Sequence, residues 1–173
     1  MHTSTYEDPV IPQLGRYDID TSQSAVTFTT RHLFGLGPVT GTFGFRTGYV
    51  AVAEPATESA AYAEIETASF RTGNGQRDHA VVSPRFLDAR THPVMVVRLS
   101  RLDPGSRGFA GTLTVREVTR PVSLTIAECA ADGRSFTARA AARIDRTEFG
   151  VTASRGLAAR YLQLTVEVRC VRL

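Results

Sequence analysis

Apolar and polar residues alternate along most of the chain from Gly15 onward, which is the pattern of β-strands with one buried face. The last strand is the clearest, because apolar residues occupy every second position: Leu162, Leu164, Val166, Val168 and Cys170. Segments of this kind predict about eight strands. Besides the last one, they cover residues 25–31, 39–50, 59–67, 94–101, 109–116, 121–127 and 135–145, and residues 17–20 would form a short first strand.

One segment lacks this alternation and predicts the only helix. Residues 76–82 follow the turn sequence Gly73-Asn74-Gly75 and stop at Ser83-Pro84. Sequential antiparallel strands with short links and little helix close most naturally into a barrel, which removes exposed sheet edges. We therefore expect an all-β fold, an antiparallel eight-stranded barrel with one short helix, and a two-sheet sandwich is the alternative. Residues 1–14 are expected to form an N-terminal tail, and residues 15–173 a single barrel domain.

The inner faces of these strands carry aromatic residues beside small ones. A barrel of about eight strands is just wide enough for side chains to fill it, and small side chains leave room for one ligand. No Asp, Glu or Arg falls on the inner face of the best-defined strands, so a ligand held there should be mostly hydrocarbon. The alternative is that small residues meet large ones across the barrel and leave no cavity. The residues expected to bind the ligand are Phe28, Gly41, Phe43, Phe45, Ala63, Ile65, Val97, Leu99, Leu113, Val115, Leu124, Ile126, Ala138, Ala140, Ala142, Leu164 and Val166.

The alternation also orients several individual side chains. In residues 39–50 it turns Tyr49 inward. It turns Cys170 inward and Cys129 outward, so the two thiols are expected on opposite sides of the barrel wall, where they cannot form a disulfide. At the end of one strand, Asp145 and Arg146 are expected to form a salt-bridged corner.

Composition and charge mainly exclude classes of protein and kinds of site. The 173 residues suit one domain. Its 20 basic residues are all Arg and face 17 acidic ones, and the net charge of +3 is far from the surplus of a nucleic-acid-binding surface. No run is long enough for a membrane span, and the first residues show no basic region followed by an apolar stretch, so no secretion leader is expected. Two cysteines without CxxC spacing indicate neither a disulfide scaffold nor a zinc site, so a cytoplasmic location is expected.

Several short motifs occur in a characteristic order: Tyr17-Asp18-Ile19-Asp20, Val39-Thr40-Gly41-Thr42-Phe43, Arg77-Asp78, His92-Pro93, Val118-Thr119-Arg120-Pro121-Val122 and Ile144-Asp145-Arg146. In order and spacing they resemble the YceI-like family, from about Tyr17 to the C-terminus. The resemblance implies a lipocalin-like, extended barrel whose lumen holds a long polyisoprenoid chain of the polyprenyl or isoprenoid-quinone type. The expected role is non-catalytic binding, sequestration or transport of this lipid, with no metal and no cofactor.

Polar residues near the expected barrel ends are candidates for contacts with a lipid head group. They are His32 after a strand, and Arg77 and His79 in the predicted helix. With Asp78 they support an alternative function, a small enzyme acting on a lipidic or quinone-like substrate near the barrel mouth, because a carboxylate beside His can orient a general base. Helix neighbours do not face each other, so a structural role, with Asp78 offsetting the helix dipole, is favoured. A third alternative is a ligand-free interaction module, such as a homodimer formed through an exposed strand face.

Overall fold

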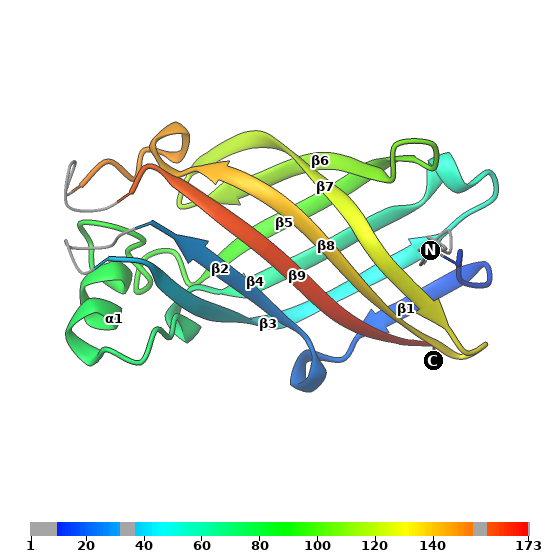
Figure 1. The fold of residues 1–173 in the computed structure, drawn as a ribbon, viewed down its shortest axis with the longest axis horizontal. Helices are drawn as coiled ribbons and strands as arrows, with labels where there is room; N and C mark the ends of the chain where they lie inside the picture. Colours follow the sequence, from blue (N-terminus) through cyan, green and yellow to red (C-terminus); the bar gives the residue numbers. More distant parts are fainter. Residues whose placement is uncertain (1–9, 32–36, 154–158, 173) are drawn as a thin grey trace, which may run out of the picture.

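The computed structural model describes residues 10–31, 37–153 and 159–172. In this part of the chain, nine strand segments form one antiparallel sheet that closes on itself (Figure 1). The pairings of β2 with β9 and of β3 with β4 complete the ring. The segments are β1 (Gly15–Ile19), β2 (Ala25–Thr30), β3 (Val39–Val52), β4 (Ala60–Glu66), β5 (Val94–Asp103), β6 (Gly108–Val115), β7 (Val118–Ala131), β8 (Ser135–Asp145) and β9 (Tyr161–Arg172).

The first two segments together occupy a single position in the barrel. Both β1 and β2 pair with β3 on one side and with β9 on the other. A short 3-10 turn, Thr21–Gln23, separates them, and Asp20 caps it by accepting hydrogen bonds from the Ser22 backbone N–H (3.0 Å) and hydroxyl (2.6 Å). The nine segments therefore make a closed, eight-stranded antiparallel barrel, which confirms the predicted fold class.

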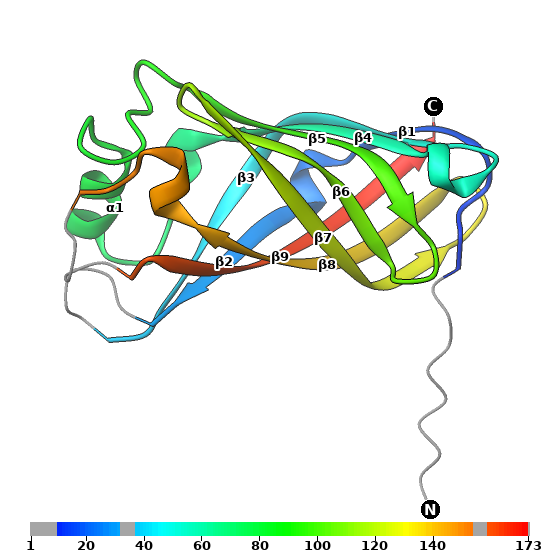
Figure 2. The same ribbon diagram turned by 90° about the horizontal axis from the view of Figure 1, so that it is seen from above.

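The short helix α1 (Gly75–Val82) lies between β4 and β5 and covers one end of the barrel (Figures 1 and 2). Asn74 caps it by accepting a hydrogen bond from a first-turn backbone N–H at 3.1 Å, and the helix ends before Ser83-Pro84, as predicted. Val81 packs against Phe28 and Phe70, which attaches the helix to the barrel through apolar contacts. Within the described residues, no helix is long and apolar enough to cross a membrane.

Bulges interrupt the alternation of inward and outward side chains in three of the described strands. They lie between Phe45 and Thr47 in β3, between Leu99 and Arg101 in β5, and between Ile126 and Glu128 in β7. Each bulge inserts one extra residue into one strand, so the side chains beyond it change face.

Two predicted orientations are wrong because of these bulges. Tyr49 points outward, where its ring stacks on Tyr62 with 5.8 Å between the ring centroids, while its neighbour Val50 faces the lumen. Cys129 points inward, so it lies on the same side of the wall as Cys170. Both thiols are free.

Candidate functional site

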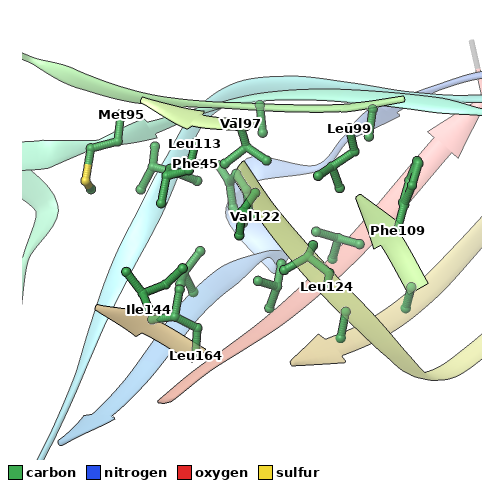
Figure 3. A pocket seen from close by; sticks show the side chains of 18 of the residues that line it. Phe45, Met95, Val97, Leu99, Phe109, Leu113, Val122, Leu124, Ile144 and Leu164 are labelled. Carbon is green, nitrogen blue, oxygen red and sulfur yellow. The ribbon is translucent and has the colours of Figure 1, made fainter. Parts of the chain in front are cut away.

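The closed barrel encloses a cavity of about 720 Å³ that extends along its length. Its lining residues come from every strand and from the segments at both ends of the barrel. Figure 3 shows side chains from different strands pointing into the same space, among them Val97, Leu113, Leu124 and Leu164. Most of the lining side chains are aliphatic or aromatic, so the lumen is an apolar chamber.

The structure places nearly all of the predicted binding residues in the wall of this cavity. Of that set, only Gly41 and Ala142 are not part of the lining. A Cβ at Gly41 would lie 2.5 Å from the Phe28 ring and 2.6 Å from the Arg71 carbonyl oxygen, so the Phe28 ring already fills the space in front of it. Ala142 is buried without reaching the cavity. Contact of the other residues with a ligand stays a prediction.

Small side chains leave the lumen open. Ala63, Ala138 and Ala140 occupy inward positions on β4 and β8. On β7, the neighbour of β8, Val122 and Leu124 also point inward and keep part of their surface accessible, because they border the cavity. The interior is therefore hollow, and the alternative of a barrel filled by its own side chains does not hold.

At the α1 end, the described part of the wall is a tight apolar plug. Phe70, Val81, Phe86, Phe149 and Val151 all line the cavity and are between 3 and 7% exposed. The alternation of strand residues did not identify the two phenylalanines at positions 86 and 149, because both lie in turns outside the strands. Their size and apolar character were the only signal available from the sequence.

At the opposite end, the wall is open to solvent. Pro104 and Gly105 of the β5–β6 turn are exposed, and Val10 and Ile11, which precede β1, are 56% and 57% exposed. Since these residues also line the cavity, the mouth of the lumen lies at this end. Residues 10–14 are called the mouth segment below. They fall within the predicted tail, and yet they contribute to the wall of the lumen.

Arg146 is a buried cation at the α1 end of the cavity, with 8% of its surface exposed. Its guanidinium donates hydrogen bonds to the backbone carbonyl oxygens of Val151 (2.8 Å), Ala153 (3.0 Å) and Ala159 (2.9 Å). These bonds tie the chain after β8 to the barrel end, which is the work of a structural residue.

The corner predicted at the end of β8 is salt-bridged, with Arg160 as the partner of Asp145. Asp145 pairs with Arg160, whose Nε lies 2.8 Å from the carboxylate, because Asp145 and Arg146 point in different directions at the end of β8. Burial pushes the pKa of Asp145 upward, but hydrogen bonds from the Thr147 backbone N–H (2.9 Å) and hydroxyl (2.6 Å) and from Arg160 outweigh it. The pKa of Asp145 therefore lies below its ordinary value.

Both thiols lie in the wall towards the mouth. Cys170 is fully buried, and burial raises its pKa to about 12, with a smaller contribution from the Cys129 thiol. Burial also raises the pKa of Cys129. Protonated thiols are poor nucleophiles, so the inward-facing sulfurs act as apolar parts of the wall.

Residues 17–170 match the family model described as the YceI-like domain. The chain belongs to the YceI-like family. This agrees with the resemblance inferred from the motifs of the sequence. A search of the curated proteins found no match.

Solved structures share this YceI-like fold. BcnA from Burkholderia cenocepacia is 21% identical with a TM-score of 0.75, and the match covers 87% of this chain and 98% of BcnA. A polyisoprenoid binding domain from Saccharophagus degradans is 14% identical with a TM-score of 0.68, covering 93% and 100% of the two chains. The YceI protein of Campylobacter jejuni is 22% identical with a TM-score of 0.64, covering 78% and 85%. At these identities the likeness shows the fold alone.

In this YceI-like barrel, the polar motif on α1 lies away from the lumen. The Asp78 carboxylate accepts hydrogen bonds from the Thr72 backbone N–H (3.0 Å) and hydroxyl (2.5 Å), and Arg77 Nε donates to the same hydroxyl at 2.9 Å. These bonds hold the loop before α1, and neither Arg77 nor the exposed His79 lines the cavity. His32, the third predicted head-group contact, lies outside the described residues. Among the residues with a described position, no three His, Cys, Asp or Glu side chains gather as a metal ion requires.

Proposed function

We propose that the protein binds a long-chain polyisoprenoid lipid, of the polyprenyl or isoprenoid-quinone type, in the lumen of its barrel. The observation that carries this proposal is the continuous apolar cavity of about 720 Å³. Cavities of roughly 300–1,000 Å³ are typical of small-molecule sites. Because this one extends along the barrel, it suits a chain better than a compact ring system.

Hydrophobic burial is sufficient to hold such a ligand. Each buried methylene contributes about 0.8 kcal/mol, so a chain of several isoprene units needs few hydrogen bonds. Selection among lipids then depends on the length of the lumen between its plugged end and its mouth. Membership of the YceI-like family supports this proposal, and so does the shared fold with a structure described as a polyisoprenoid binding domain.

The proposed role is binding, sequestration or transport, without catalysis. Thr30 and Ser59, which line the cavity, are already engaged: the Thr30 hydroxyl donates to a backbone carbonyl (3.3 Å) and the Ser59 hydroxyl accepts from a backbone N–H (3.0 Å). Arg146 donates to backbone carbonyls. An enzyme would need polar groups that converge on a substrate in the lumen, and the candidate trio around Asp78 lies on α1 instead.

The proposed location is the cytoplasm. The chain has only two cysteines, Cys129 and Cys170, without CxxC spacing, so nothing in its composition indicates the disulfide scaffold of an oxidising compartment. Fractionation of cells that make the protein tests this, since we expect it in the cytoplasmic fraction and its recovery in an oxidising compartment would contradict the proposal.

Native mass spectrometry of freshly purified protein, followed by organic extraction, tests the proposed function. We expect a mass excess that extraction removes and that matches a polyprenyl or isoprenoid-quinone species. A protein that purifies empty and does not take up an added prenyl alcohol such as geranylgeraniol would refute lumen binding. Conversion of the extracted lipid into a product of different mass during incubation would favour the enzyme instead.

A further inference from the structure

The mouth segment crosses the open end of the lumen before the chain enters β1 (Figure 2). At its start, the Val10 backbone N–H donates to the Cys129 carbonyl oxygen of β7 at 3.3 Å. Towards its end, the Gln13 carbonyl accepts a hydrogen bond from the Tyr17 hydroxyl of β1 at 2.8 Å. In the ring, β7 and β1 are separated by β8 and β9, so the segment spans the rim from one side to another.

The two ends of this segment are attached unequally. Near β1, the Tyr17 hydroxyl binds Gln13, and the Arg172 guanidinium donates to the Leu14 carbonyl oxygen and to Gln13 Oε1 (3.5 Å). Near β7, the 3.3 Å bond at Val10 is the one hydrogen bond found among the described residues. Among the described residues, the segment is therefore anchored by side-chain hydrogen bonds beside β1 and by a single backbone hydrogen bond at β7.

The half of the segment beside β7 is the half that covers the lumen. Val10, Ile11 and Pro12 line the cavity at its mouth, whereas Leu14 does not. Val10 and Ile11 are nevertheless more than half exposed, so lifting them from the rim breaks few contacts. A lipid that leaves through the mouth passes between these residues and the β5–β6 turn, whose Pro104 and Gly105 line the cavity at the same end.

We propose that the mouth segment is a lid that sets the rate at which lipid enters and leaves the lumen. It closes over the bound chain and swings about its anchor at Gln13 and Leu14, as gating segments do in other binding sites. This inference rests on the proposed function, because a lid acts only on a lumen that takes up lipid. It adds that exchange kinetics depend on residues 10–12.

Release kinetics test the lid, with all-trans-retinol as a fluorescent isoprenoid probe. The double variant Val10→Ala/Ile11→Ala removes the side chains over the mouth. Leu14→Ala is the matched control, since Leu14 is 50% exposed in the same segment but does not line the cavity. Loaded protein is mixed in a stopped-flow instrument with excess phosphatidylcholine vesicles, and retinol transfer is followed. Uptake is measured separately by mixing empty protein with retinol.

The double variant is expected to release and to take up retinol about tenfold faster than the wild type. Its Kd should change by less than about threefold, because a lid slows entry and exit alike and so affects the two rates more than their ratio. The Leu14→Ala control should match the wild type. Tyr17→Phe removes the anchoring hydroxyl but keeps the edge contact of its ring with Phe136, whose centroid lies 4.9 Å away, and it too should accelerate release.

The outcomes separate the lid from the binding site. Wild-type rates in the double variant, with retinol bound equally tightly, would refute the lid and leave lumen binding intact. A wild-type protein that binds neither retinol nor geranylgeraniol would refute the proposed function, and the lid with it. As a control, thermal unfolding of each variant establishes that the barrel is folded under the conditions of the kinetic measurements.

Discussion

Replacing Ala140 with Phe puts a ring into the middle of the lumen. Ala140 lies on β8 between Ile126 of β7 and Val166 of β9, and all three line the cavity. The next residue, Ala141, pairs with threonines on the same two strands but is exposed on the outside of the barrel. Ala141→Phe is therefore a matched control that adds the same ring to the opposite face of the same strand.

The hollow lumen predicts opposite effects of Ala140→Phe on stability and on binding. A ring placed in open apolar space buries additional surface, of the order of 100 Å² at about 25 cal/mol per Å², so the free energy of unfolding should stay the same or rise by up to about 2.5 kcal/mol. A filled barrel would instead be overpacked, at a cost of about 1–3 kcal/mol. For the lipid, displacement of one isoprene unit removes roughly five buried carbons at about 0.8 kcal/mol each, which weakens Kd about a thousandfold.

Two measurements on each variant check this reasoning. Denaturant unfolding gives the free energy of unfolding, and native mass spectrometry together with retinol titration gives lipid retention and Kd. We expect Ala140→Phe to fold normally and lose lipid, and Ala141→Phe to retain it. Unchanged retention in a folded Ala140→Phe variant would refute the lumen as the binding site, and a large loss of stability would refute its hollowness.

Four further substitutions probe the wall of the barrel and its ends. Gly111→Ala should lower the free energy of unfolding by about 3 kcal/mol or more in denaturant unfolding, because its Cβ would lie 1.8 Å from a β5 carbonyl oxygen. Gly75→Ala at the start of α1, which meets nothing within 4 Å, should not destabilise, and equal losses at the two sites would contradict the steric argument. The raised pKa of Cys170 keeps its proton in the folded state while the unfolded chain loses it, so stability falls from about pH 9 towards pH 12 by up to about 1.4 kcal/mol per pH unit. Cys170→Ala should make that alkaline decline in melting temperature shallower, and an unchanged slope would argue against the buried thiol as its cause. Because the pKa of Asp145 is lowered in the folded state, its carboxylate stabilises the fold at pH values above the pKa that it has in the unfolded chain. Asp145→Asn should therefore lower the melting temperature at pH 7 and reduce the fall in melting temperature between pH 4 and pH 2. An unchanged dependence of the melting temperature on pH in this acid range would show that the hydrogen bonds of Asp145 do not stabilise the fold.

The barrel and most of its inner surface could be predicted from the sequence because strand alternation is a local property. On β9, five alternating apolar residues from Leu162 to Cys170 assign the inner face without reference to any other strand. The inward alanines of β8 follow in the same way. The order of the eight strands in the barrel could also be predicted, because each strand pairs with its neighbours in the sequence. The exception is the pairing of β9 with β1 and β2, which closes the ring.

Features that depend on an extra residue or on a loop could not be predicted in this way. No local signal marks the bulge after Ile126, and a single inserted residue carried Cys129 to the other face. The plug formed by Phe86 and Phe149 depends on how turns fold back over the barrel end. Arg77 and Asp78 look like a reactive pair in sequence, but their partner is Thr72, which becomes visible only in the folded loop.

The pairing of β2 with β9, which closes the ring, also determines the stage of folding at which the lumen forms. Across this seam the Arg169 backbone N–H donates to the Ser24 hydroxyl at 3.0 Å, over a sequence separation of 145 residues. Pairings between such distant residues form late in folding, and β9 is synthesised after all the other strands of this barrel. Without β9 the ring is open, because β9 joins β8 to β1 and β2. The lumen therefore exists only once β9 has paired, and a chain that lacks β9 has no enclosed space for the lipid proposed above.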